Sequence, residues 1–162
     1  MGGPSRPSLA RLLGALAYQQ TLLGDARRNR AFHRALAARV RPGQAVLDLG
    51  AGTGVWAVAA ARLGARRVVA VEREAVPVPV IEAPARAHRG ADRIEVAQAD
   101  ARRVRLPRAF DVVVSEMVGN EAFEEGLLPV LARARTLFLR RGGALVPESV
   151  ALAAAPVRAP VS

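Results

Sequence analysis

Cysteine is absent from the sequence, which excludes both disulfide bonds and thiolate metal sites. The only two histidines, His33 and His88, are too far apart along the chain to form a metal-ligand motif, so we expect no metal. A chain without cysteine is also compatible with a reducing compartment, and we expect the protein to be cytoplasmic.

Lysine is absent as well, and aromatic residues make up only 4% of the sequence. All 24 basic residues are arginine, and the formal net charge is +10. A nucleic-acid-binding surface normally combines clustered basic residues with aromatic side chains that stack on bases. Because these arginines are scattered and aromatic partners are few, the composition disfavours nucleic acid as a partner.

Long apolar runs are also missing. No run approaches the roughly 18 residues that a membrane span needs, so no membrane association is expected. What is present is a hydrophobic fraction of 51% in 162 residues, the size of one ordinary domain with a single core.

The first third of the chain predicts a short leader followed by helices. Residues 1–8 are rich in Gly, Pro and Ser and are expected to be disordered. In residues 9–42 the spacing of leucines indicates helices, with an interruption near Gly24 and Asp25. Arg41-Pro42-Gly43 ends this helical region.

From residue 43 to 148 the pattern alternates between strands and helices. Strands are expected at 45–49, 67–72, 93–98, 111–115 and 143–147, and helices at 55–65 and from about 123 to 139, the last closed by Gly142 and Gly143. Continuous apolar strands with helices between them are typical of a parallel sheet covered on both sides. We therefore predict an α/β fold with a mostly parallel sheet and helices on both faces.

The segment between Glu72 and Ile94 interrupts this pattern. A right-handed crossover between parallel strands requires a helix there, but Pro77, Pro79 and Pro84 fall inside it. Any helix is expected to be short and to begin near Pro84.

A glycine-rich loop follows the first predicted strand. Gly50, Gly52 and Gly54 lie where the strand passes into a helix, the position at which open α/β sheets bind nucleotides. Dinucleotide enzymes and methyltransferases share this type of loop. Val55 occupies the third-glycine position of the dinucleotide motif, which disfavours a dinucleotide.

Three carboxylates follow successive strands. Asp48 ends the first strand and suits a ligand with a cationic amine, whereas Glu72 ends the second and is placed to bind both hydroxyls of a ribose. Asp100 follows the third strand and is placed to recognise an adenine amino group.

The segments "VLDLGAGTG", "VVAVE", "AQAD" and "DVVVSE" together resemble the successive motifs of class I S-adenosylmethionine-dependent methyltransferases. The resemblance covers residues 40–147 and implies a Rossmann-like fold, S-adenosylmethionine as methyl donor and S-adenosylhomocysteine as product. It implies that residues 43–148 form the donor-binding domain.

Within that class, residues 115–149 are similar to the protein arginine methyltransferases. That family has two glutamates nine residues apart after its fourth strand, and Glu116 and Glu125 match this spacing. The resemblance makes both glutamates catalytic and also places Glu116 at the donor. Asp25 and Arg28 match a family segment in which the arginine binds the methionine carboxylate of the donor.

The chemistry of arginine explains a pair of glutamates. A guanidinium is always protonated, and two carboxylates that bind its planar fork localise its charge away from the attacking nitrogen. The nearby Glu121 and Glu124 are instead interpreted as residues of a helix's first turn, where the dipole favours acidic side chains.

The sequence departs from this family at three places. Only Tyr18 represents a tyrosine-rich lid, and Arg102 stands where the family often has a glutamate near the adenine. Residues 149–162 resemble the start of the family's C-terminal β-barrel, which carries a catalytic histidine, and are expected to be a remnant of it or a tail.

Several functions therefore remain open. The favoured one is methylation of arginine, or another nitrogen, in a protein or peptide acceptor. The chain could instead be a donor-binding module that is inactive alone, or one completed by a partner chain. A nucleic-acid methyltransferase is disfavoured because the Asn/Asp-Pro-Pro-aromatic stretch of such enzymes is replaced by Ser-Glu-Met-Val at 115–118. A nicotinamide-dependent oxidoreductase is the last alternative.

Overall fold

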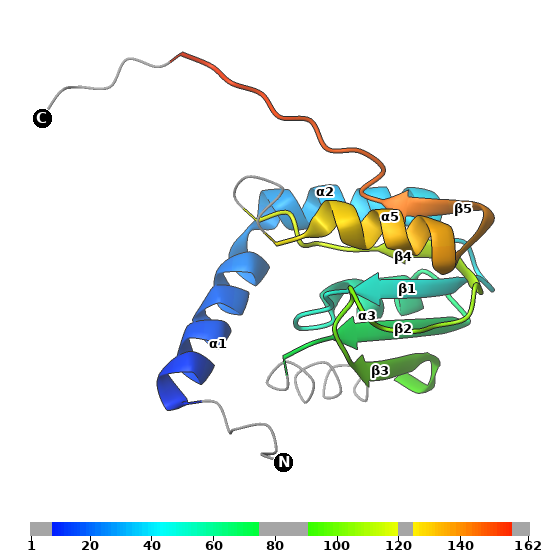
Figure 1. The fold of residues 1–162 in the computed structure, drawn as a ribbon, viewed down its shortest axis with the longest axis horizontal. Helices are drawn as coiled ribbons and strands as arrows, with labels where there is room; N and C mark the ends of the chain where they lie inside the picture. Colours follow the sequence, from blue (N-terminus) through cyan, green and yellow to red (C-terminus); the bar gives the residue numbers. More distant parts are fainter. Residues whose placement is uncertain (1–7, 75–90, 120–124, 157–162) are drawn as a thin grey trace, which may run out of the picture.

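The computed structural model describes residues 8–74, 91–119 and 125–156 (Figure 1). Helices α1 (Leu9–Gly24) and α2 (Ala26–Arg39) come first, followed by β1 (Ala45–Leu49), α3 (Val55–Arg62) and β2 (Arg67–Glu72). The 3-10 turn η1 (Ala91–Arg93), β3 (Ile94–Gln98), β4 (Phe110–Val114), α5 (Leu127–Leu137) and β5 (Leu139–Val146) complete the described chain.

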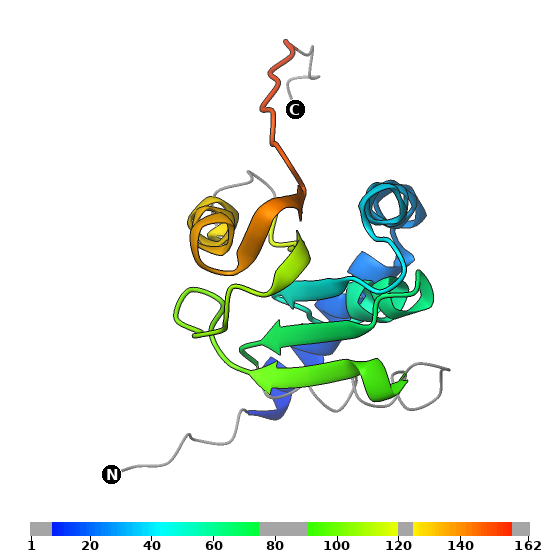
Figure 2. The ribbon, with the colours of Figure 1, turned by 90° about the vertical axis from the view of Figure 1, so that its right-hand side faces the viewer.

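The five strands form one sheet in the order β3-β2-β1-β4-β5, and every neighbouring pair is parallel. The predicted α/β class is therefore confirmed. Parallel strands require helical connections that cover the sheet, and Figure 2 shows α5 on one side of it and α2 and α3 on the other.

Alternation along the strands divides the core into two layers, because successive side chains point to opposite faces. On β1, Val46 belongs to the cluster that packs with Leu36 of α2 and Trp56 of α3. Leu47 and Leu49 belong to the cluster that packs with Phe110 and Phe138 under α5. By this parity Asp48 faces the α2 and α3 side.

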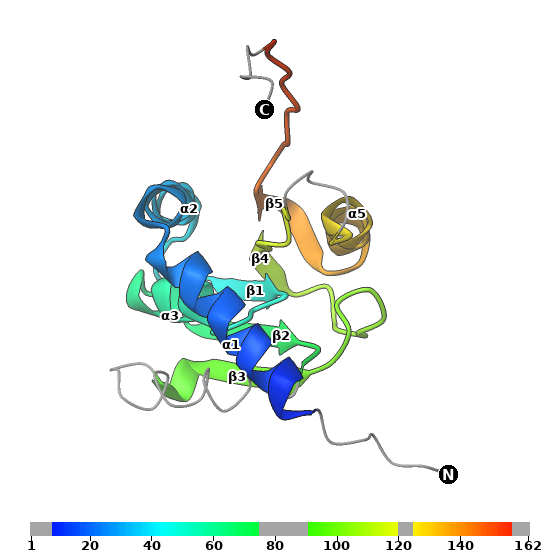
Figure 3. The same cartoon turned by 90° about the vertical axis from the view of Figure 1, so that its left-hand side faces the viewer.

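The break between the first two helices lies where the sequence predicted it. Asp25 is the N-cap of α2, and its Oδ1 accepts a hydrogen bond from the backbone N–H of Arg28 at 2.9 Å. Helix α1 crosses the carboxyl ends of the strands, in front of the edge where β1 and β2 end (Figures 1 and 3).

Both predicted ends of the last helix are wrong. Helix α5 begins at Leu127 and not near residue 123, and Glu121 and Glu124 lie outside the described residues. Helix α5 stops at Leu137, and Gly142 and Gly143 lie inside β5 instead of closing the helix. Phe138 is 1% exposed, and its carbonyl accepts hydrogen bonds from the backbone N–H groups of Ala109 and Phe110. Burial of Phe138 against the sheet thus turns the chain into β5 four residues early.

Two other predictions concern residues that lie outside the described ranges or at their C-terminal end. Pro77, Pro79, Pro84 and His88 lie outside the described residues, so the crossover prediction is not tested. Residues 149–156 have no regular secondary structure, are exposed and lead away from the sheet (Figure 1). Their assignment as a barrel remnant stays a prediction.

Candidate active site

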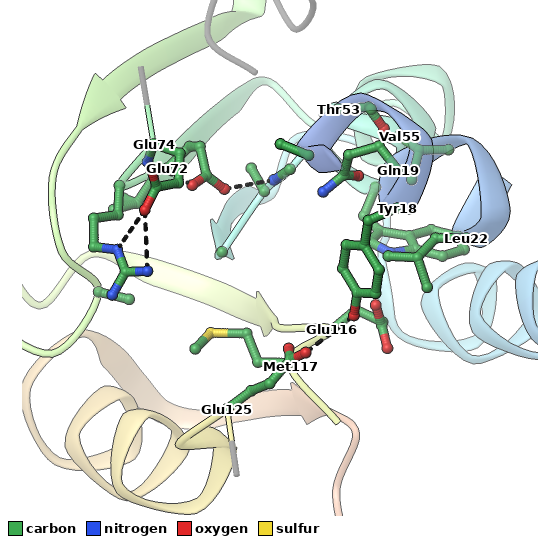
Figure 4. A pocket seen from close by; sticks show the side chains of 18 of the residues that line it. Tyr18, Gln19, Leu22, Thr53, Val55, Glu72, Glu74, Glu116, Met117 and Glu125 are labelled. Atoms are coloured by element: carbon green, nitrogen blue, oxygen red, sulfur yellow. Dashed lines mark hydrogen bonds and ion pairs between the residues drawn. The ribbon is translucent and has the colours of Figure 1, made fainter. Parts of the chain in front are cut away.

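A cavity of about 520 Å³ lies between α1 and the carboxyl ends of the strands (Figure 4). Its volume falls within the roughly 300–1,000 Å³ that is usual for small-molecule sites. Its walls come from α1, from the glycine loop after β1, and from the residues that follow β2, β3 and β4. The strand ends of an open parallel sheet are the usual place for a nucleotide-like ligand.

Most of the site residues predicted from the sequence line this one cavity. They are Arg28, Gly50, Gly52, Glu72, Asp100, Glu116 and Glu125. Asp48 and Gly54 are not part of its lining: Asp48 is buried within β1, and Gly54 is the N-cap of α3. Residues from five separate segments of the sequence are thus brought together.

The glycine loop passes close beneath the cavity. Gly50 and Gly52 have φ values of 74° and 53°, which side chains other than glycine rarely adopt. A Cβ on Gly50 would lie 2.8 Å from the side chain of Met117, and one on Gly52 would lie 2.9 Å from that of Gln19. Both positions therefore need glycine for their backbone conformation, and any side chain there would also displace Met117 or Gln19.

Glu72 joins the end of β2 to this loop. Its two oxygens accept 2.8 Å hydrogen bonds from the backbone N–H groups of Gly52 and Glu74. The residue is 8% exposed, yet its side chain lines the cavity (Figure 4). Each carboxylate oxygen has a second lone pair, so Glu72 can hold the loop and still accept hydrogen bonds from ligand hydroxyls.

Asp100 is paired with the arginine that the sequence analysis singled out. Arg102 donates to Asp100 from Nε and from a terminal guanidinium nitrogen, the latter at 2.7 Å. These hydrogen bonds hold the pKa of Asp100 well below its usual value, so it is a carboxylate at any ordinary pH. Both residues line the same end of the cavity.

Asp48 lies behind the loop without a stabilising partner. It is 0% exposed, and neither carboxylate oxygen has a hydrogen-bond partner among the described residues. Burial raises its pKa to about 7; the nearby backbone N–H of Ala57 opposes the shift without meeting hydrogen-bond geometry, and Glu72 and Glu116 add to it. Asp48 therefore lies behind the cavity and is not part of its wall.

The two predicted catalytic glutamates each have a partner from the N-terminal helices. Arg28 forms an ion pair with Oε2 of Glu116, and these side chains are only 19% and 13% exposed. The hydroxyl of Tyr18 donates to Glu125 Oε1 at 3.0 Å (Figure 4). Burial and this hydrogen bond raise the pKa of Tyr18, so it remains a donor.

Several anchors fix Arg28 and Glu116 in place. One terminal nitrogen of Arg28 donates to the carbonyl of Leu22 at 3.2 Å and to Asn29 Oδ1 at 2.8 Å. On the other side, the hydroxyl of buried Ser115 donates to the carbonyl of Leu49 at 2.8 Å, which fixes the start of the Glu116 loop. The ion pair therefore connects α2 to the end of the sheet.

Gln19, Trp56 and Met117 are among the lining residues that sequence reasoning missed. No motif distinguishes them, and Gln19 and Trp56 reach the cavity only because α1 and α3 pack beside the loop. Met117 follows Glu116 directly, so its neighbour could have drawn attention to it. Tyr18 was noted only as part of an incomplete lid, and its contact with Glu125 depends on the tertiary fold.

Residues 8–74, 91–119 and 125–156 contain no cluster of His, Cys, Asp and Glu suited to a metal ion. Among the helices of these same ranges, none has the length and apolar character required to cross a membrane.

Comparison with known proteins identifies the fold family. The family model described as "Ribosomal protein L11 methyltransferase (PrmA)" matches residues 32–124, more than half of the chain. The chain belongs to the class I S-adenosylmethionine-dependent methyltransferases. Its methyl donor is therefore expected in the cavity, and the residues there suit it, because Glu72 offers free lone pairs to a ribose beside a glycine loop.

Individual relatives connect this methyltransferase to arginine methylation. It is 34% identical over 145 residues to protein arginine N-methyltransferase PRMT10 of Oryza sativa subsp. japonica, a match covering 88% of this chain and 38% of the relative. It is 35% identical over 135 residues to the arginine N(omega)-methyltransferase of Streptomyces achromogenes subsp. streptozoticus, covering 81% of this chain and 37% of the relative.

A solved structure of an arginine methyltransferase complex is also similar to this chain. The Trypanosoma brucei PRMT1 enzyme-prozyme heterotetrameric complex with AdoHcy matches this methyltransferase with a TM-score of 0.72 and 25% identity. That match covers 79% of this chain and 41% of the other. The chain thus spans about two fifths of the length of these relatives.

Proposed function

We propose that this methyltransferase transfers a methyl group to a guanidinium nitrogen of arginine in a protein or peptide. The observation that carries the proposal is the presence of two carboxylates, Glu116 and Glu125, on the wall of the donor cavity. The relatives at 34% and 35% identity carry arginine in their names, which supports the same acceptor chemistry.

The donor end of the cavity is assigned to the residues beside the glycine loop. Glu72 would bind the ribose hydroxyls, Asp100 the adenine amino group and Arg28 the methionine carboxylate. Gly50 and Gly52 let the backbone approach the ligand, and Gly54 begins the helix that follows. Asp48 lies in β1, directly before this loop. When bound, S-adenosylmethionine supplies a methyl group whose bond to sulfur breaks as the new bond to nitrogen forms, leaving the electron pair on sulfur.

The acceptor end is assigned to the two glutamates. Together they would bind the guanidinium fork and draw its positive charge away from the nitrogen that attacks the methyl carbon. Charge balance requires that a proton leave the methylated nitrogen. We assign this proton to Glu125, whose partner is a neutral tyrosine hydroxyl, because Arg28 is anchored beside Glu116 and keeps a positive charge near that carboxylate.

A donor-binding module completed by a partner chain is the second candidate. It is favoured by the share of the relatives that the chain spans and by the enzyme-prozyme assembly of the matched Trypanosoma brucei structure. In that case the site would bind S-adenosylmethionine, but transfer would require the missing residues from elsewhere.

Transfer of a labelled methyl group from S-adenosylmethionine tests the proposal. The acceptors are an arginine-rich protein mixture and, separately, free arginine. We expect label in protein, released on hydrolysis as methylarginine, and a loss of at least about 100-fold in Glu125→Gln, the size typical of a lost acid-base group. Glu148→Gln is the matched control, because Glu148 is an exposed glutamate paired with Arg39 outside the cavity.

The alternatives give different results. Label in free arginine alone would replace the protein acceptor by the amino acid. Donor binding without transfer to any acceptor would support the module completed by a partner. Label in lysine or in a terminal amine would contradict the arginine assignment.

A further inference from the structure

We infer that Arg28 is an internal competitor for the acceptor site: without donor it occupies the guanidinium position on Glu116, and donor binding releases that position. This inference rests on the proposed function, because it takes Glu116 as an acceptor ligand and Arg28 as a donor ligand. The new element is a coupling between donor binding and acceptor binding.

The contact itself is between the same chemical groups as in the proposed substrate complex. A guanidinium nitrogen of Arg28 meets Oε2 of Glu116, just as a substrate arginine would. Both side chains are more than four-fifths buried, so water screens their attraction weakly. An arriving substrate must therefore compete with a guanidinium that is tethered beside Glu116.

Arg28 has the freedom to change partner over a short distance. One of its terminal nitrogens remains on Leu22 and Asn29, while only the other reaches Glu116. A guanidinium has five N–H groups, and planar carboxylates are its preferred partners. Because Arg28 also lines the donor cavity, a ligand carboxylate there can take over the nitrogen now held by Glu116.

Charge favours the substrate over Arg28 at the two glutamates once the donor has bound. In the described structure the acceptor end holds Glu116, Glu125 and Arg28, so the charge of one of the two carboxylates is already neutralised. A donor carboxylate on Arg28 restores both negative charges for the substrate. S-adenosylhomocysteine has such a carboxylate but no sulfonium, so it tests the effect without a reaction and without a repelling charge.

Linkage gives the inference a measurable form. If S-adenosylhomocysteine strengthens acceptor binding by some factor, acceptor must strengthen S-adenosylhomocysteine binding by the same factor. We expect a factor of at least about five, the lower end of typical coupling between sites. If Arg28 had a purely structural role, Arg28→Gln would lower both affinities and leave the coupling factor unchanged.

The experiment measures the affinity of a fluorescent peptide containing a single arginine, by anisotropy, with and without saturating S-adenosylhomocysteine. Wild type is compared with Arg28→Gln and with Arg30→Gln, a matched control because Arg30 is exposed on the same helix and does not line the cavity. Saturation is established for each variant by calorimetry.

In wild type and Arg30→Gln we expect peptide binding at least about fivefold tighter with S-adenosylhomocysteine. In Arg28→Gln we expect the ligand-free protein to bind peptide more tightly than ligand-free wild type, and the coupling factor to fall to about one. Arg28→Lys keeps the cation and should retain part of the coupling.

Equal peptide affinity with and without S-adenosylhomocysteine in wild type would overturn the inference while leaving the proposed function intact. So would coupling of wild-type size in Arg28→Gln. If no protein bound the peptide in either condition and no methyl transfer to arginine occurred, the proposed function itself would fail. The wild-type arms decide the question even if Arg28→Gln does not fold.

Discussion

Asp48 shows how a single buried residue connects the stability of the fold to pH. Its carboxylate is fully buried without a hydrogen-bond partner among the described residues, and burial raises its pKa from 3.8 to about 7. The folded state therefore holds a proton on Asp48 between about pH 4 and 7 that the unfolded chain releases. Stability falls as pH rises through this window and is level above it.

Asp48→Asn should remove this pH dependence, because asparagine has nearly the same shape and no charge. A shift of about three pKa units corresponds to at most roughly 4 kcal/mol, and we expect part of this to appear as a smaller loss of unfolding free energy between pH 4 and 8. Urea denaturation at several pH values measures it. Asp92→Asn, which replaces an exposed aspartate, is the control, and equal pH profiles for Asp48→Asn and wild type would contradict the assignment.

At the scale of elements, the junction of α1 and α2 positions both partners of the two glutamates proposed to be catalytic. Asp25 caps α2 through the backbone N–H of Arg28, while the side chain of the same residue reaches Glu116. Tyr18 lies one and a half turns before the end of α1 and reaches Glu125. The two helices therefore provide the hydrogen-bond partners of both glutamates at the acceptor end of the cavity.

Asp25→Ala should lower the free energy of unfolding by about 1 kcal/mol, the usual cost of a lost N-cap. Because Arg28 is in the first turn of the same helix, we also expect weaker binding of S-adenosylhomocysteine. Asp25→Asn should behave like wild type, since asparagine caps helices equally well. Denaturant unfolding measures the first effect and calorimetry the second. Unchanged ligand affinity in Asp25→Ala would mean that the N-cap does not contribute to ligand binding.

On the scale of the whole molecule, the sheet and its helices contain a donor cavity within a chain about two fifths as long as its relatives. The residues proposed to bind the donor come from α2 and from the ends of β1, β2 and β3, and Glu116 follows β4. All of these belong to one sheet and the helices packed beside it. Donor binding should therefore be a property of this chain alone, whatever the transfer reaction requires.

We expect S-adenosylhomocysteine at 100 times its dissociation constant to stabilise the protein by about 2.7 kcal/mol and to raise the melting temperature by a few degrees. Thermal unfolding followed by circular dichroism measures the shift. Glu72→Ala should abolish the shift in melting temperature. The control is Glu95→Ala, which removes an exposed ion pair between Glu95 on β3 and Arg67 on β2 and should keep the shift. A chain that bound no donor would show no shift in any of the three proteins.

Much of this arrangement follows from the sequence. The strand and helix order, the break at Asp25 and the identity of seven cavity residues were all predictable, because apolar periodicity and strand-end carboxylates are local signals. The end of α5 was predicted wrongly, since the pattern contained glycines at 142 and 143 but no sign that Phe138 would be buried. The roles of the site residues remain predictions until the variants above are measured.

The sequence by itself determined the parallel α/β sheet, the glycine loop and the set of acidic residues at the strand ends. Only the tertiary structure decided which partners those acidic residues have. Glu116 lies 88 positions from Arg28, and Glu125 lies 107 from Tyr18. Such pairs have no local pattern, because they form only where two helices pack across the end of a sheet and their side chains share one cavity.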